Sequence, residues 1–417
     1  MENALTGSFI AALALATATR LWLALRQIRH VQVHRDAVPP GFDRVLSLAA
    51  HQTAADYAIA KTRLGIADLL IGVAALLALT LGGGLQAGSD ALARVLDPSR
   101  LWHGTALIVC VVVLLSLLEL PVALWRTFVI ETRFGFNRQT PALFVADLVR
   151  QAFVGAALGV PLVILVLWLM TRMGEYWWLY VWLAWMAFNL LVLLLYPTLI
   201  APLFNRFTPL ADPALASRIE ALLARCGFRA SGLFVMDGSR RSSHGNAYFT
   251  GFGAARRIVF FDTLLARLAP QEIEAVLAHE LGHFKRRHVW KRVAWLFALS
   301  LAMLWGLGQL ASHAWFYAGL GVNTPSTAAA LLLFFLVVPV YIFPLQPLAS
   351  LYSRRHEFEA DAYAANHASA ANLVRALVRL YQDNAATLTP DPLYSAFYDS
   401  HPPATMRIAR LQEMPSP

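Results

Sequence analysis

Residues 275–288 read AVLAHELGHFKRRH and contain a His-Glu-x-x-His pattern. Acidic side chains before the pattern and basic ones after it complement a helix dipole, so the stretch is predicted to be one helix. Residues four apart share a helical face, so His279 and His283 can converge on one metal ion while Glu280 reaches a water on that ion. This arrangement is typical of a zinc metalloprotease, in which the metal acidifies a water and the glutamate takes its proton.

A third ligand is needed, because a catalytic zinc ion takes three protein ligands and leaves its fourth position open. The segment 353–364, SRRHEFEADAYA, places Glu357 and Asp361 four residues apart on one helical face. Glu357 is predicted to bind the metal, and Asp361 to accept a hydrogen bond from the outer nitrogen of a ligand histidine. Glu359 points to another face and is the poorer candidate. A solvated acidic helix paired with its neighbouring arginines is the alternative.

The composition is that of an integral membrane protein. The chain is 58% hydrophobic and 14% charged, with a mean hydropathy of +0.55. Its formal charge of +9 resides in short loops between apolar runs, so membrane topology accounts for it and no nucleic-acid partner is expected. Cys110 lies in an apolar run and Cys226 in the polar middle, so neither a disulfide framework nor a cysteine metal site is predicted.

Seven apolar runs are long enough to cross a bilayer. They cover residues 5–25, 64–85, 104–125, 152–171, 176–200, 292–312 and 328–346. The first lacks a cleavage site and is interpreted as a retained span rather than a signal peptide. The polar stretch 30–61 is predicted to be a loop or an amphipathic helix at the membrane face. Asp68, Glu119 and Asn189 are candidates for facing an internal wet space, although the first two also lie near the ends of spans.

The polar segments divide the chain into four predicted regions. They are an N-terminal membrane region of about five spans (1–205), a mixed α/β insertion with the His-Glu-x-x-His helix (206–291), two further spans (292–350) and a helical tail (351–417). Within the insertion, residues 212–226 predict a helix, and short stretches from residues 232, 246 and 257 predict a small sheet. The basic loops alternate, so the positive-inside rule places the N-terminus outside and both the insertion and the tail on the cytoplasmic side.

Five longer motifs together closely resemble the CAAX prenyl endopeptidase family of integral membrane zinc metalloproteases. They are AHELGH, SRRHEFEADAYA, DGSRRSSHGNAYFTGFG, ETRFGFNRQT and YSAFYDSHPPATMR, spread over nearly the whole chain. The resemblance implies a mainly α fold, in which seven transmembrane helices form a barrel around an intramembrane chamber beside the small α/β region. It implies one Zn²⁺ per chain on His279, His283 and Glu357 at the cytosolic end, with Glu280 as catalytic base and Asp361 in support.

The same resemblance adds two residues from the last motif. It implies that His401 lies near the scissile bond, where it could donate to the oxyanion, and that Arg407 binds backbone or carboxylate oxygens of the substrate. Without the resemblance, His401 reads as a turn residue, because two prolines follow it.

An exposed edge strand can hold an extended peptide by backbone hydrogen bonds alone, which suits a protease. The candidate substrate strand comprises Asn246, Ala247, Tyr248 and Phe249; an ordinary core strand is the alternative. The remaining histidines beside the motifs are interpreted as solvated or structural; they are His244, His288 and His356.

The predicted activity is hydrolysis of a peptide bond, with Glu280 taking a proton from the attacking water and later giving it to the leaving amine. The resemblance implies cleavage after a prenylated cysteine near a C-terminus. A membrane quality-control protease is an alternative, and a transporter or lipid-binding chamber with structural zinc is an alternative of another class. The expected partners are a peptide or protein substrate and membrane lipid. The expected location is a bacterial inner membrane, or the endoplasmic reticulum if the source is eukaryotic.

Overall fold

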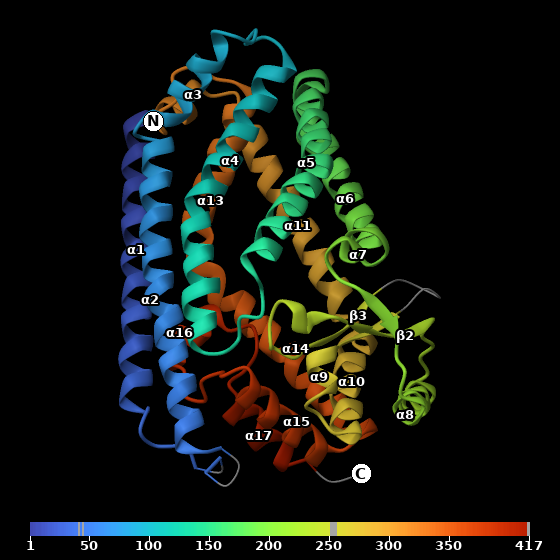
Figure 1. Ribbon diagram of the computed structural model, residues 1–417. Coiled ribbons are helices and arrows are strands. Elements are labelled where there is room, and N and C mark those ends of the chain that lie inside the picture. Colours follow the sequence, from blue (N-terminus) through green and yellow to red (C-terminus); the bar gives the residue numbers. More distant parts are fainter. Residues whose placement is uncertain (41, 44–45, 251–256, 415–417) are drawn as a thin grey trace.

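The computed structural model describes residues 1–40, 42–43, 46–250 and 257–414. Among these, seven helical stretches are long and apolar enough to cross a membrane, which confirms the predicted number. They are α1 (Glu2–Val33), α2 (Leu48–Leu79), α4 (Leu101–Trp125) with a π-helical turn to Glu131, α5 (Pro141–Arg172), α6 (Trp177–Leu195) continuing into α7 (Ala201–Phe204), α11 (His288–Leu310), and α13 (Thr327–Ile342) continuing into α14 (Gln346–His367). Short helices α3 (Gly84–Ala93) and α12 (Ala314–Ala318) connect spans at the end that holds the N-terminus (Figure 1).

The first two spans are longer than predicted, because most of the polar stretch 30–61 continues α1 and α2 instead of forming a loop or a separate surface helix. Each of these helices has 32 residues. At 1.5 Å per residue such a helix is roughly 48 Å long, against a hydrocarbon core of about 30 Å. The polar ends therefore extend beyond the apolar layer, which explains why apolar run length alone underestimates these helices.

The predicted small sheet is present and has four strands. They are β1 (Phe207–Pro209), β2 (Gly232–Met236), β3 (Ala247–Thr250) and β4 (Arg257–Phe261), in the spatial order β1-β2-β4-β3. The β2–β4 pair is parallel and the other two pairs are antiparallel. In the part of the chain that the structure describes, β3 pairs with β4 alone and so forms one edge of the sheet.

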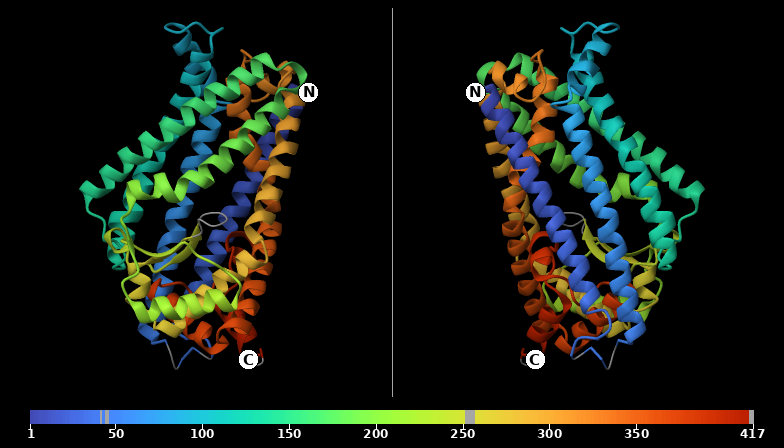
Figure 2. Two further views of the ribbon diagram at one scale, coloured as in Figure 1. Left: turned by 90° about the vertical axis from the view of Figure 1, so that its right-hand side faces the viewer. Right: turned by 90° about the vertical axis from the view of Figure 1, so that its left-hand side faces the viewer.

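The remaining α-helices lie at the end of the molecule that holds the C-terminus (Figures 1 and 2). They are α8 (Pro213–Arg225), α9 (Asp262–Leu265), α10 (Pro270–Lys285), α15 (Ala370–Asp383), α16 (Pro392–Tyr398) and α17 (Ala404–Gln412). Most of them pack around this sheet and α10, whereas α16 packs against α1 and α14. One buried apolar cluster joins α8, the sheet, α10, α15 and α17, and a second lies among the membrane helices. The two metal-site helices, α10 and α14, both contribute to the first cluster.

Two of the three polar residues predicted to face an internal space do line a cavity. It has a volume of about 510 Å³, lies between α1, α2, α4 and α13, and is bordered by Asp68 and Glu119 together with Arg20 and Lys61. Asn189 instead donates its side-chain amide to the backbone oxygen of Trp185 on its own helix. Asp68 and Glu119 therefore border a cavity that also holds two basic side chains, whereas an isolated charge in hydrocarbon would be costly.

Candidate active site

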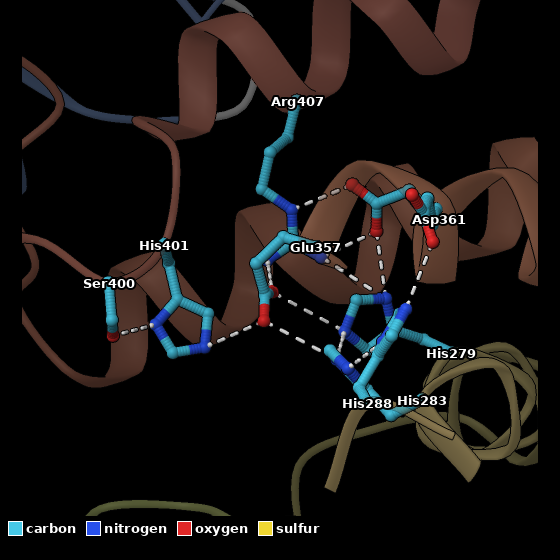
Figure 3. A network of polar contacts seen from close by, with 9 residues as sticks. His279, His283, His288, Glu357, Asp361, Ser400, His401 and Arg407 are labelled. Atoms are coloured by element: carbon cyan, nitrogen blue, oxygen red, sulfur yellow. Dashed lines mark hydrogen bonds and ion pairs between the residues drawn. The ribbon is translucent and has the colours of Figure 1, made fainter. Parts of the chain in front are cut away.

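Three ligand groups converge where α10 crosses α14 (Figure 3). The Nε2 atoms of His279 and His283 are 3.2 Å apart, and they lie 3.5 and 3.3 Å from the carboxylate oxygens of Glu357. Two ligand atoms placed about 2 Å from a tetrahedral ion are separated by roughly 3.3 Å. The spacing of this group is therefore that of a metal site with a single ion.

The donor set also fits a divalent cation chemically. The Oε2 atom of Glu357 is buried and has no hydrogen-bond partner among the described residues, although an unsatisfied buried carboxylate oxygen is unfavourable. Two imidazole nitrogens and one carboxylate oxygen are the ligands that zinc accepts in catalytic sites. A bound Zn²⁺ would satisfy this oxygen and both nitrogens together.

Close packing of α10 on α14 brings the ligands within reach of one another. A Cβ at Gly282, between the two ligand histidines, would lie 2.9 Å from the Ala360 Cα and 3.0 Å from the Tyr363 Cβ. Such distances are not tolerated between carbon atoms, so only glycine allows this approach. The glycine of the HELGH sequence therefore sets the distance between the histidines on α10 and Glu357 on α14.

The predicted helix 275–288 is wrong at its end. α10 stops at Lys285, Arg287 adopts a left-handed conformation with φ of 57°, and α11 begins at His288. This break turns the chain from the site into the sixth membrane span. It also brings His288 back beside His283, which a single straight helix would not do.

Asp361 lies behind His279, as predicted for a residue that fixes the ligand tautomer. Its Oδ1 is 2.8 Å from the His279 Nδ1, and the Arg407 guanidinium donates to both of its oxygens, at 2.8 and 2.6 Å. The family resemblance implies that Arg407 binds substrate oxygens, yet Arg407 is buried, and two of its nitrogens bind Asp361. The remaining Nη1 lies 3.7 Å from the Glu357 Oε2. Arg407 therefore supports Asp361 and the ligand Glu357 from within the protein.

The protonation of His279 is set by these neighbours. Burial lowers its pKa, but the carboxylates of Asp361 and Glu357 beside its two ring nitrogens outweigh burial and raise the pKa to about 9. In the metal-free protein this ring therefore holds a proton at neutral pH. Metal binding must release that proton, because only the neutral ring can coordinate.

His283 is held from behind by a residue that sequence reasoning left without a specific role. The His288 Nδ1 is 3.0 Å from the His283 Nδ1, and its Nε2 is 3.0 Å from the Glu359 Oε2. His288 is buried and stacks on buried His356 with ring centroids 3.9 Å apart. His288 and His356 are therefore structural histidines and not solvated ones. Glu359 faces away from the metal group, as predicted.

His401 reaches the site from the loop between α16 and α17. Its Nε2 lies 3.5 Å from the Glu357 Oε1, its Nδ1 is 3.0 Å from the Ser400 hydroxyl, and its ring is largely exposed. Arg354 holds this loop by donating to the backbone oxygens of Ser395 and Asp399. Arg354 is one of the arginines that the sequence pairs with its own acidic helix, because its actual partners lie 41 and 45 residues away along the chain.

Glu280 and the candidate substrate strand border the same site. Glu280 is half-buried on α10, and its carboxylate has no ion-pair or hydrogen-bond partner within the described residues. Ala247, Tyr248 and Phe249 lie in β3, the edge strand that contacts α10, whereas Asn246 is exposed and precedes it. Phe249 packs against Phe284 of α10, with ring centroids 6.0 Å apart. An edge strand and an unpaired carboxylate thus flank the ligand group.

Comparison with known proteins places this geometry in a family. The model for "CAAX prenyl protease N-terminal, five membrane helices" matches residues 27–206, and that for "Peptidase family M48" matches residues 209–415. A CAAX prenyl protease 1 homolog of Arabidopsis thaliana is 38% identical over 75% of this chain and 74% of the relative. This chain belongs to the CAAX prenyl protease family. The corresponding protease of Saccharomyces cerevisiae is 34% identical over 71% of this chain and 69% of the relative.

A solved member of this family has the same fold. The crystal structure of S. mikatae Ste24p superposes with a TM-score of 0.89 at 28% identity, covering 98% of each chain. The prediction of a mainly helical membrane barrel with a small sheet is confirmed. Membership in the CAAX prenyl protease family makes the chain an integral membrane metalloendopeptidase, which excludes the transporter alternative as its primary function. The relatives named here are eukaryotic, so they give no support to the expected bacterial inner membrane.

Proposed function

We propose that this protein is a zinc endopeptidase that cleaves prenylated peptides near their C-termini, with its site on the cytoplasmic side of the membrane. The observation that carries the proposal is the group formed by the imidazoles of His279 and His283 and the carboxylate of Glu357, which lie within metal-ligand reach of one another. The Oε2 atom of this carboxylate is buried and has no hydrogen-bond partner among the described residues. The substrate class is supported by relatives named CAAX prenyl protease 1. The orientation is supported by the basic loops on the same side as the site.

Each residue of the site has a task in this proposal. Zinc on His279, His283 and Glu357 would supply acidification of a water and polarisation of the scissile carbonyl. Glu280 takes the proton of the attacking water and later delivers it to the leaving amine. His401, exposed beside Glu357, donates to the oxyanion that develops on the carbonyl.

The strand β3 holds the peptide in this proposal, and its backbone pattern supports that role. The Phe261 N–H donates to the Asn246 oxygen, and hydrogen-bonded pairs alternate along an antiparallel ladder. The backbone groups of Ala247 and Phe249 therefore face the free edge. The Ala247 N–H is occupied by the Asn246 side chain, so among the described residues of β3 the Phe249 N–H is the outward donor that remains for a peptide.

The central experiment compares the purified protein with its Glu280→Gln variant on a farnesylated peptide and on the same peptide without the lipid. We expect the variant to keep one zinc per chain, measured by elemental analysis, and to lose turnover. A matched control is Glu274→Gln, since Glu274 lies on the same helix but binds Arg218 and Arg225 away from the site. Full turnover by Glu280→Gln would refute the assigned base. Equal turnover of both peptides would refute a requirement for the lipid and favour the quality-control alternative.

The substrate strand is tested by changing one backbone donor. Phe249→Pro removes the outward N–H without removing a bond between β3 and β4, since proline is tolerated at such edge positions. Phe249→Ala is the matched control, because it loses the same ring and keeps the N–H. We expect a much larger rise in KM for the proline variant. Equal KM values in the two variants would refute peptide binding at this edge.

A further inference from the structure

The ETRFGFNRQT loop, residues 131–140, joins the third and fourth membrane spans and takes no part in the ligand group described above. It instead lies against residues 241–244, the segment that leads into β3. Backbone contacts join the two segments: an isolated antiparallel bridge between Asn137 and Ser242, Arg138 N–H to Arg241 O at 3.1 Å, and Ser243 N–H to Phe136 O at 3.1 Å. The loop between the third and fourth membrane spans thus pairs with the segment that directly precedes the candidate substrate strand.

One end of the 241–244 segment is fixed by a bidentate ion pair. Arg241 donates from Nε and Nη2 to the two oxygens of Asp147 on α5, at 2.8 and 2.9 Å. Asp147 is buried and also accepts from Gln139 of the loop at 2.9 Å. Arg241 donates further to the side chain of Asn205 at 3.0 Å. Charge-assisted, two-pronged contacts of this kind fix orientation as well as position.

The other end is fixed through His244. Its ring stacks on Phe136 of the loop, with centroids 4.5 Å apart, and its Nε2 lies 3.5 Å from the Glu131 Oε2. Glu131 in turn accepts a 2.6 Å hydrogen bond from the hydroxyl of buried Tyr57 on α2. The His244 Nδ1 is 3.0 Å from the side-chain oxygen of Asn384, at the end of α15. His244 therefore joins two membrane spans to the tail.

We infer that residues 131–140 form a clamp that positions β3 for peptide binding, with Glu131, Tyr57, Asp147 and Arg241 as positioning residues. The inference rests on the proposed substrate strand. β3 begins at Ala247, three residues after His244, and has β4 as its neighbouring strand in the described chain. The clamp thus fixes the segment that enters β3, a strand with only one neighbouring strand in the described chain. The metal ligands belong to α10 and α14, so loosening the clamp affects peptide binding before it affects the metal.

The test uses Glu131→Ala, with Glu131→Gln as the conservative variant that can still accept from Tyr57. The matched control is Glu175→Ala. Glu175 is an exposed residue in the connection between α5 and α6, and it has no partner among the described residues. Hydrogen exchange of residues 242–249, zinc content, and kcat and KM on the farnesylated peptide are measured for each protein. For Glu131→Ala we expect faster exchange in this segment, unchanged exchange in α10, and a KM raised about tenfold at nearly constant kcat and zinc. Glu131→Gln should restore most of the KM, and the control should match the wild type.

The possible results separate the clamp from the substrate strand. Unchanged exchange in residues 242–249 overturns the clamp, and a raised KM in Phe249→Pro would then leave the substrate strand intact. Faster exchange with an unchanged KM overturns β3 as the peptide-binding strand, and with it the inference about positioning. Loss of zinc together with activity assigns Glu131 a general structural role and also overturns the inference.

Discussion

The ligand group and the candidate substrate strand lie side by side but are held in different ways. The ligands come from two helices in backbone contact at Gly282, and both histidines have a second partner behind them, Asp361 for His279 and His288 for His283. The strand β3 has one neighbouring strand in the described chain, and its approach is fixed by a loop between membrane spans. The chemistry is therefore built on a rigid crossing, whereas peptide binding depends on parts that the membrane helices position.

The largest effect is expected from removing the third ligand. Glu357→Ala leaves two histidines, which cannot hold a catalytic zinc ion, so we expect loss of zinc and a fall in kcat/KM of at least about a thousandfold. Elemental analysis and peptide cleavage measure the two losses. Glu359→Ala, two residues on and facing away, should keep zinc. Equal zinc loss in both variants would contradict the distinction between these faces.

A smaller but severe effect is expected at the helix crossing. In Gly282→Ala the new methyl group would sit 2.9 Å from the Ala360 Cα, so α10 and α14 must separate. We expect a loss of about 1–3 kcal/mol in stability, measured by thermal unfolding, together with weaker zinc binding. Gly306→Ala on α11 is the control, because its Cβ would meet open space. Normal zinc affinity in Gly282→Ala would show that the crossing tolerates displacement.

The support behind His283 is expected to matter less. His288→Ala removes the group 3.0 Å from the His283 Nδ1, and loss of such outer partners typically lowers metal affinity about 10- to 100-fold. Competition with a chelator measures the change. The exposed His313, at the far end of α11, provides a control variant, His313→Ala. An affinity equal to that of the wild type would reduce His288 to a packing residue.

The last prediction alters no residue that binds zinc and concerns the pH dependence of zinc binding. Because the His279 pKa is raised to about 9, the ring is protonated below that pH, and zinc must displace the proton. Apparent affinity should therefore fall by up to about tenfold for each pH unit below 9 and become independent of this group above it. Asp361→Asn removes the leading cause of the raised pKa and should flatten the slope, as measured by zinc competition between pH 6.5 and 8.5. An equally steep slope in that variant would assign the proton to another group.

Spacing along the chain suffices to predict much of this architecture. Apolar run length predicts seven spans, and the i, i+4 pairs on two helices predict that His279, His283, Glu357 and Asp361 come together. Run length and i, i+4 spacing each depend only on residues close together in the sequence. The contact between the two helices does not. That contact follows from the ligand count that zinc requires and from the family resemblance.

The partners behind the site could not be predicted in this way. Arg407 binds Asp361 across 46 residues of sequence, and Arg354 binds a loop more than 40 residues away. His288 reaches His283 only because Arg287 takes a left-handed conformation, which is uncommon for a residue with a Cβ. These contacts depend on the three-dimensional path of the chain, and no periodic pattern records them.

The order of the ligands along the chain has a consequence for assembly. Between His283 and Glu357 the polypeptide leaves the site through α11, crosses the membrane and returns through α13. An ion bound to both residues thus ties the ends of an entire transmembrane hairpin to each other, as a disulfide would do in a secreted protein. Correct insertion of the last two spans and metal loading are consequently linked steps. Removal of the ion should break the link between His283 and Glu357 and loosen the ends of this transmembrane hairpin.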